Sequence, residues 1–269
     1  MKRTCYAALC AALLLLTGLA VAQDVHSQSL TARSVGPDVI KTPPGAPKYC
    51  KPCLFYGGDF DTSDSNAGGL ANETDLIITG SPYGAATFTP VKVPAGKTWT
   101  VTGLFTNSFN NIGETPLIDP ATSYWEIRSG LNPKKDGTAG KLVAKGTTKA
   151  TYKPTGRDSG FEATDLVKGI KYKKKAITLA GGKEYWFTVV SNCTNSSDST
   201  CSAGIRYFLS DIEDAKAINA FGPKEPVDQS EFNSPTFGFA YVNTEEVCNG
   251  SGIGCDRFSA GILGTAAAK

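Results

Sequence analysis

The sequence has almost no histidine, and this scarcity excludes several kinds of catalytic and metal site. Its 269 residues contain one histidine, His26, in a polar stretch ahead of the first strand-like segment. Ser-His-Asp and Cys-His catalysis each need a positioned imidazole, and histidine-based zinc sites need several. An enzyme built on this chain would have to use carboxylates, tyrosine, lysine or arginine.

Long apolar runs are absent after the first residues of the chain. It starts with "MKR", continues with an apolar stretch over residues 6–21, and reaches the small-x-small site "AVA" at residues 20–22. The apolar stretch is shorter than the ~20 residues of a membrane-spanning helix. The pattern predicts a cleaved signal peptide over residues 1–22 rather than an anchor. We therefore expect a secreted protein, extracellular or periplasmic, without a membrane span.

The chain also lacks a charge excess of either sign once this peptide is removed. Cleavage takes two of the 27 basic residues and none of the 25 acidic ones, so the formal charge of +2 belongs to the precursor. Nucleic-acid binding needs a strongly basic face. The near-neutral balance favours no nucleic-acid partner.

Helical periodicity is nearly absent, and short strand-like segments dominate. They are rich in Thr, Val, Ile and aromatic residues and are separated by Gly, Pro, Asn and Asp. This pattern predicts an all-β, jelly-roll-like β-sandwich of two antiparallel sheets with about ten strands. We expect one domain at 49–269, preceded by a flexible polar leader at 23–48. The expected strands lie at 75–80, 86–93, 98–106, 123–130, 141–152, 169–180, 184–191, 205–210, 236–242 and 257–264.

Six cysteines remain after cleavage, and an even number in an exported chain indicates disulfides. Their spacing favours local pairs, each across a turn-rich loop. The "CKPC" motif also has a redox interpretation, but a double glycine follows it where a reactive cysteine would need a helix. A zinc site would need a second ligand pair, which the sequence lacks. The expected pairs are Cys50–Cys53, Cys193–Cys201 and Cys248–Cys255.

Aspartates follow this motif closely, at Asp59, Asp61 and Asp64. Clustered carboxylates in a loop are ligands that Ca²⁺ prefers. The EF-hand register fails, because Asp64 stands where that loop needs glycine. The favoured interpretation is a solvated, turn-rich loop, and a structural Ca²⁺ is the alternative.

Two pairs of adjacent aromatics are the candidate ligand-binding residues: Tyr124-Trp125 and Tyr185-Trp186. Aromatic rings with nearby polar groups suit sugar binding. Neighbours on a strand point to opposite faces, so one ring of each pair is expected in the core and the other partly exposed. Glu126 and Glu184, beside these rings, form a weaker candidate for a glycosidase pair.

Lysines gather in "KYKKK" at 171–175. Lysines on an edge strand discourage sheet-to-sheet aggregation, and we favour this interpretation over contact with acidic glycans or a cell surface. "TGRDSG" at 155–160 predicts a turn in which Arg157 and Asp158 form a surface ion pair.

Four sequence segments resemble a known group of proteins: "YGGDFDTSDSNAGGLANETDLIITGSPYGAATFTPVKVPAGKTWTVTGLFTN", "SYWEIRSG", "KPTGRDSGF" and "YWFTVVSNCTNSSDSTC". Over residues 54–264 the chain resembles a group of exported bacterial proteins of unknown function with jelly-roll sandwiches. The resemblance implies fold and compartment and brings no catalytic motif.

These observations favour an exported non-catalytic binding or surface protein, with carbohydrate as the ligand class and an extracellular glycan or cell surface as partner. Two alternatives stay open. One is a glycan-acting enzyme that uses carboxylates, Tyr or Lys, and the other is a structural component of the extracellular matrix or envelope.

Overall fold

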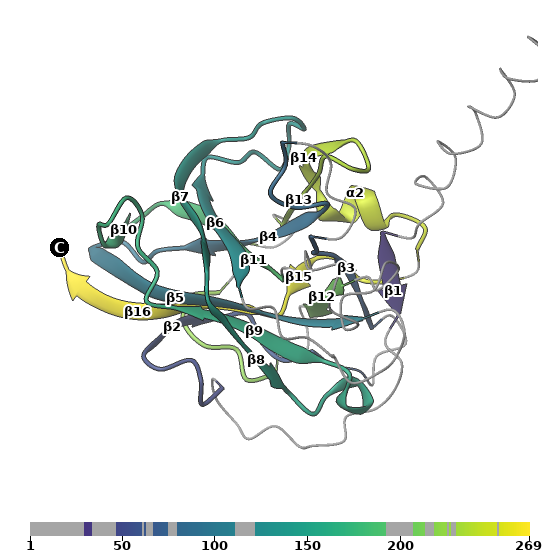
Figure 1. Ribbon diagram of the computed structural model, residues 1–269. Helices are drawn as coiled ribbons and strands as arrows, with labels where there is room; N and C mark the ends of the chain where they lie inside the picture. Colours follow the sequence, from purple (N-terminus) through teal and green to yellow (C-terminus); the bar gives the residue numbers. More distant parts are fainter. Residues whose placement is uncertain are drawn as a thin grey trace, which may run out of the picture.

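The computed structural model of the chain is a β-sandwich of two antiparallel sheets (Figure 1). It describes residues 30–33, 47–60, 62, 67–74, 80–110, 122–191, 207–212, 218–224, 226, 230–251 and 253–269. Within these residues sixteen strands are accompanied by one short α-helix, α2 (Thr244–Cys248), and one 3₁₀ turn, η2 (Asp158–Gly160). The predicted all-β sandwich is confirmed. The predicted signal peptide and most of the predicted leader lie outside the described residues.

The larger sheet has ten strands, and the long strand β5 (Lys97–Asn110) organises it. Along one side β5 pairs first with β16 and then with β12, and along the other with β10 and β9. Its first half alternates threonines with the buried Trp99 and Val101, which suits a strand with one partly solvated face. Its second half is buried throughout from Gly103 to Phe109. The remaining strands are β1 (Thr31–Arg33), β2 (Cys53–Tyr56), β3 (Gly68–Ala71), β8 (Ala150–Pro154), β9 (Ala163–Lys168), β10 (Ile177–Ala180), β12 (Tyr207–Ile212), β15 (Arg257–Phe258) and β16 (Ala260–Ala268).

The smaller sheet has six strands in the order β14-β13-β4-β11-β6-β7. In Figure 1 it forms the layer above β5 and β16. Strand β7 lies at one edge and pairs only with β6. The strands are β4 (Ala86–Lys92), β6 (Ser123–Ser129), β7 (Lys141–Thr148), β11 (Glu184–Ser191), β13 (Glu231–Ser234) and β14 (Phe239–Asn243).

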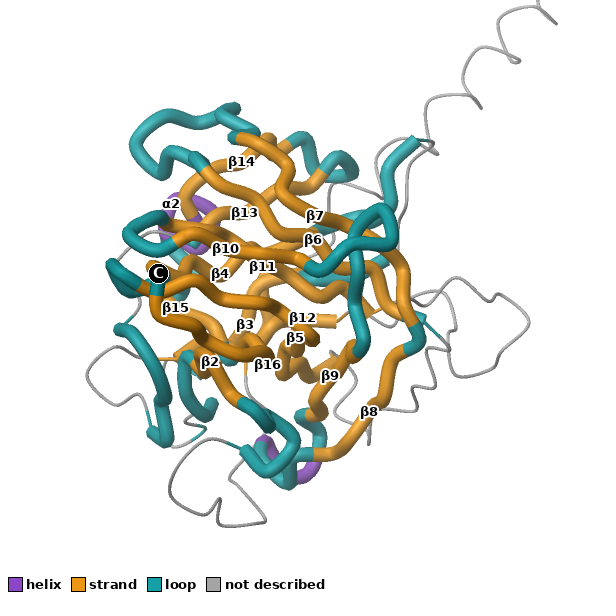
Figure 2. Tube along the Cα trace, turned by 90° about the vertical axis from the view of Figure 1, so that its left-hand side faces the viewer, coloured by secondary structure: helices purple, strands orange, loops and turns teal. Residues whose placement is uncertain are grey.

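The main apolar core fills the space between the sheets at the end of the sandwich that holds β7 and β10. Figure 2 shows how the strands stack around it. Side chains along each strand point alternately to the two faces of the sheet, so every second one points into the space between the sheets. Burial of these inward apolar side chains is the main contribution to the stability of the fold. Its larger members include Phe55, Trp99, Trp125, Leu179, Tyr185 and Phe187.

A second apolar cluster surrounds Phe109, Phe208 and Phe232, and a buried polar layer is formed by side chains of β6, β9 and β11. In this layer Asp165 of β9 accepts hydrogen bonds from Ser123 of β6 at 2.7 Å and from Ser191 of β11 at 2.8 Å. These contacts join the larger sheet to the smaller one. Since every partner lies on a strand, the layer fixes how the two sheets are aligned.

Two of the three predicted disulfides are present. Cys50 bonds to Cys53 with a Cα–Cα distance of 4.7 Å, and Cys248 bonds to Cys255 with a Cα–Cα distance of 6.1 Å. Cys193 and Cys201 lie outside the described residues. The first bridge joins the segment before β2 to the first residue of that strand, and the second joins the end of α2 to the segment before β15. Both bridges stiffen local loops, as their short spacing predicts.

Most predicted strand segments coincide with observed strands, but four need correction, and the segment 75–80 lies outside the described residues except for Gly80. The segment 236–242 forms a strand only from Phe239, and the segment 257–264 divides at Ser259 into β15 and β16. The segment 141–152 divides after Thr148 into β7 and β8. The segment 169–180 forms a strand only from Ile177, because residues 172–175 make a tight turn. Three residues of the predicted leader form β1, which pairs with β3.

Candidate binding site

The four predicted ligand-binding aromatics are all buried. Trp125 and Tyr185 lie in the main core, and Tyr124 and Trp186 lie on the opposite face of the smaller sheet. Their exposed fractions are only 1% and 5%, and 7% and 2%, respectively. The outer face is covered by Tyr83, Leu131 and Tyr241, which sequence alternation alone does not reveal. None of the four rings therefore offers an open face to a sugar.

Glu126, on the covered outer face, has both carboxylate oxygens engaged. The Tyr124 hydroxyl donates to one oxygen and Arg128 Nε donates to the other. The Arg128 guanidinium also lies 4.8 Å from the centre of the Tyr241 ring. Desolvation is the largest cause of a raised pKa for the Tyr124 hydroxyl, and the neighbouring Glu126 carboxylate adds to it. This cluster is a closed hydrogen-bond network, and its geometry is that of a structural element.

The weaker glycosidase pair, Glu126 with Glu184, does not have the required separation. Pairing of β6 with β11 places Glu126 opposite Thr188, four residues from Glu184. Four residues of strand span about 13 Å, whereas glycosidase carboxylates lie about 5–9.5 Å apart. Glu184 is also engaged by Lys92 at 3.8 Å. The pair therefore does not match the geometry of a hydrolytic site.

Asp59, the one predicted metal ligand within the described residues, forms a buried ion pair. Its Oδ1 lies 3.0 Å from Arg157 Nη1 and accepts a hydrogen bond from Tyr56, and its Oδ2 accepts from Asn219 at 2.6 Å. Among the described residues no group of three or more His, Cys, Asp or Glu side chains is arranged to hold a metal ion. Asp61 and Asp64 lie outside the described residues, so the calcium hypothesis stays a prediction.

Arg157 is buried, which corrects the expected surface ion pair with Asp158. It is only 2% exposed and lies between Asp59 and Glu162, whose Oε2 accepts from Arg157 Nε at 2.6 Å. Burial raises the pKa of the Glu162 carboxyl, and the neighbouring guanidinium opposes that shift. Through these two ion pairs, the Arg157 guanidinium links Asp59, which follows β2, to Glu162, which precedes β9. All three charged side chains are buried, which indicates a structural link rather than a site open to a ligand.

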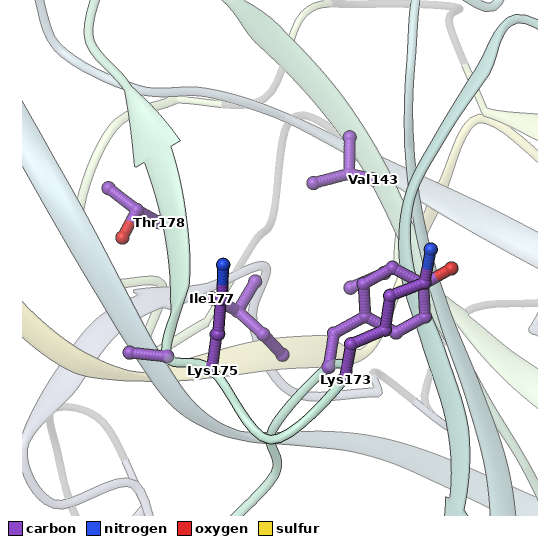
Figure 3. A pocket seen from close by; sticks show the side chains of 8 residues that line it. Val143, Lys173, Lys175, Ile177 and Thr178 are labelled. Atoms are coloured by element: carbon purple, nitrogen blue, oxygen red, sulfur yellow. The ribbon is translucent and has the colours of Figure 1, made fainter.

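One pocket of about 260 Å³ opens between the edges of the two sheets (Figure 3). We call it the lysine pocket. Strand β7 forms one wall, and the turn at 172–175 with β10 forms the other. Ala144 and Ile177 at its base belong to the main core, against which Val143 and Tyr172 also pack. Its lining residues are Val143, Ala144, Tyr172, Lys173, Lys175, Ala176, Ile177 and Thr178.

The turn that forms this wall is a two-residue hairpin turn. Tyr172 and Lys175 exchange both backbone hydrogen bonds at 3.0 Å. The central residues, Lys173 and Lys174, have φ of 49° and 65°, in the left-handed region. Positive φ at both positions is the type I′ geometry, which matches the twist of the flanking chain. The lysines of "KYKKK" therefore lie on a turn, and the edge-strand interpretation was wrong.

The segment 141–183, which supplies all eight lining residues of the lysine pocket, exposes charged side chains of a single sign. Between residues 141 and 183 the ten lysines are all exposed, whereas the three carboxylates, Asp158, Glu162 and Asp165, are all buried. Among the described residues, the lysine found in a salt bridge is Lys92, outside this span. The lysine side chains are long and solvated, so the pocket mouth carries a local positive potential. The "KYKKK" run was the sequence signal for this site, but only the fold shows that it borders a pocket.

Comparisons with known proteins add no relative to this picture. Neither the models of known protein families nor the curated proteins include a match to this chain. In the part of the chain that the structure describes, no helix combines the length and apolar character needed to cross a membrane.

Proposed function

We propose that this chain is an exported, non-catalytic binding protein that takes a carbohydrate in the lysine pocket. The observation that carries the proposal is a pocket of about 260 Å³ with an apolar base, one tyrosine ring and a polar rim. Sugar sites combine an apolar ring contact with convergent polar groups. Tyr172 supplies the ring, while Thr178 and the lysines supply hydrogen-bond donors.

The dimensions of the pocket favour a small part of a larger ligand. Its volume of about 260 Å³ lies just below the range of about 300–1,000 Å³ that holds a whole drug-sized molecule. One sugar ring or the end of a chain would fill it, and the remainder of the glycan would extend over the exposed face of β7. Two disulfides among the described residues support an oxidising compartment, where such a ligand would be met.

The test is a glycan array probed with the full chain, expressed for export, and with one pocket-blocking variant. Ala176 lines the pocket and is exposed, so Ala176→Tyr would fill the opening without disturbing the core. Ala240→Tyr makes the same substitution at an exposed position of β14, which lies at the opposite edge of the smaller sheet from β7 and does not line the pocket, and is the matched control.

We expect the chain and Ala240→Tyr to bind the same glycans and Ala176→Tyr to lose them. Absence of binding to every glycan would overturn the proposal. If absence of binding were combined with self-assembly of the chain, the structural-component alternative would replace it. Release of reducing sugar from a bound glycan would favour the enzyme alternative.

A further inference from the structure

We infer that the glycan bound in the lysine pocket is anionic and carries carboxylate or sulfate groups. This inference rests on the proposed function, because it names the class of ligand for the same pocket. Two of the eight lining residues, Lys173 and Lys175, are lysines with exposed side chains, and no acidic residue lines the pocket. A neutral sugar offers these ammonium groups only hydroxyl acceptors, whereas an acid group would accept stronger, charge-assisted hydrogen bonds from them.

The charge around the pocket extends this argument beyond the lining. On β7, Lys141 and Lys145 flank the two lining residues Val143 and Ala144. Next to the turn, Lys171 and Lys174 are also exposed. No carboxylate of the described residues pairs with any of these lysines. Because the chain without its signal peptide has balanced charge, this concentration is a local feature that would attract a polyanion and speed its association.

The backbone of the turn gives a second, independent reason. Type I′ turns favour Asn-Gly, because glycine and asparagine tolerate positive φ better than other residues do. This turn places Lys173 and Lys174 at those two positions, with φ of 49° and 65°. Side chains held in the left-handed region at the mouth of a pocket are a recognised mark of functional sites. The chain gives up local stability here and gains the Lys173 ammonium group on the pocket wall, with Lys174 next to it in the turn.

Lys173 also shows how the turn prepares the site. Its Nζ lies 5.3 Å from the centre of the Tyr172 ring, which lines the same pocket. A cation over an aromatic face is held by the ring quadrupole. The ammonium group is therefore held at the Tyr172 ring, where it would meet an acid group of a ligand that contacts the ring; Figure 3 shows Lys173 among the lining side chains.

The experiment compares Lys173→Asn/Lys174→Gly with Lys134→Asn/Lys135→Gly. Both double variants remove two exposed lysines, but only the first pair belongs to the turn. The probes are a galacturonate oligomer, its uncharged methyl ester and a sulfated oligosaccharide. Affinities are measured by calorimetry at about 20 mM and about 500 mM NaCl, since added salt screens charge interactions.

We expect an acidic oligomer to bind at least about tenfold more tightly than the methyl ester at low salt, and to lose that advantage at high salt. Comparing the galacturonate and sulfated arms identifies which acid group is preferred. The turn variant should lose most of this binding and yet melt at a higher temperature, because its new residues suit the turn. The control variant should keep its affinity within about twofold.

Three results would count against the inference, and they are distinguishable. Equal binding of the ester and the acid would overturn the anionic ligand and leave the proposed function standing. Unchanged binding by the turn variant would also overturn it. Binding to none of the glycans, with the melting-temperature increase still present, would remove the proposed function itself.

Discussion

Glu231, the first residue of β13, is a carboxylate buried without a partner. Its exposed fraction is 0%, and neither carboxylate oxygen has a hydrogen bond among the described residues. Desolvation raises the pKa of Glu231 to about 7, and the nearby negative charges of Asp136 and Glu246 add to the shift. A buried carboxylate in such surroundings costs free energy when it ionises.

Replacing Glu231 with Gln should therefore change how stability depends on pH. The pKa of Glu231 in the folded state lies above its pKa in the unfolded state. Below about pH 4.5 the carboxyl is neutral in the folded protein and does not lower its stability. As the pH rises through 7 the carboxyl ionises, and this destabilises the fold. We expect the stability of Glu231→Gln relative to the original chain to increase by about 2 kcal/mol between pH 4 and pH 8. Urea unfolding at both pH values measures this difference.

Exposed Glu245, on α2, is the matched control. Glu245→Gln removes the same charge from the same corner of the molecule, and its stability difference should change less between the two pH values than that of Glu231→Gln, because an exposed carboxylate stays in contact with water. If the stability difference of Glu231→Gln were the same at pH 4 and pH 8, the Glu231 carboxylate would have to be solvated in the folded state.

Gly261 of β16 lies so close to its neighbours that only a residue without a side chain fits there. Pairing of β16 with β5 places Gly261 opposite Phe105. A Cβ at residue 261 would overlap the Phe105 ring and lie 2.8 Å from the carbonyl oxygen of Phe55. Both neighbours are buried, so neither has room to move away.

Gly261→Ala should accordingly destabilise the fold by about 1–3 kcal/mol, the usual cost of overpacking a core. Ala266→Val enlarges an exposed position of the same strand and should change stability by less than about 0.5 kcal/mol. Thermal or urea unfolding of both variants checks the comparison. Equal stabilities would show that β5 and β16 can separate locally at little cost.

The elements also show which parts of the fold the sequence could predict. Segments of Thr, Val, Ile and aromatics indicate strands reliably because those side chains suit a pleated surface, and most of the expected strands are present. The turn at 172–175 escaped prediction because it lacks the Asn-Gly or Asp-Gly signal that marks type I′ geometry. The faces of Tyr124 and Trp125 could not be assigned because both faces of β6 are buried.

At the scale of the whole molecule, the two-sheet arrangement could be predicted from strand number and spacing, but its interior polar contacts could not. Asp165 is separated by 26 or more residues from both of its serine partners. Arg157 meets Asp59 from nearly a hundred residues away in the chain. Such contacts depend on which strands become neighbours, and a single sequence contains no local signal for that choice. The lysine pocket has the same origin, since its walls come from both sheets.

The link that Asp165 makes between the sheets leads to a prediction about the stability of the molecule as a whole. Burial raises the pKa of Asp165 to about 6, although the hydrogen bonds from Ser123 and Ser191 lower it in part. The folded pKa again exceeds the unfolded one, so this residue contributes its full stability below about pH 4, and that contribution is lost as the pH rises to about 6. Over that window the loss is about 3 kcal/mol.

Asp165→Asn should flatten this part of the pH profile, because an amide carries no charge at any pH and the serine hydroxyls can rotate to meet it. Unfolding measured from pH 4 to pH 7 should show the original chain losing stability and the variant holding its value. Asp256→Asn, at a partly exposed position, controls for the loss of one carboxylate. If Asp165→Asn lost stability as steeply as the original chain, the pH dependence would have to arise elsewhere. The polar layer between the sheets would then be stabilised by hydrogen bonds that do not depend on the charge of Asp165.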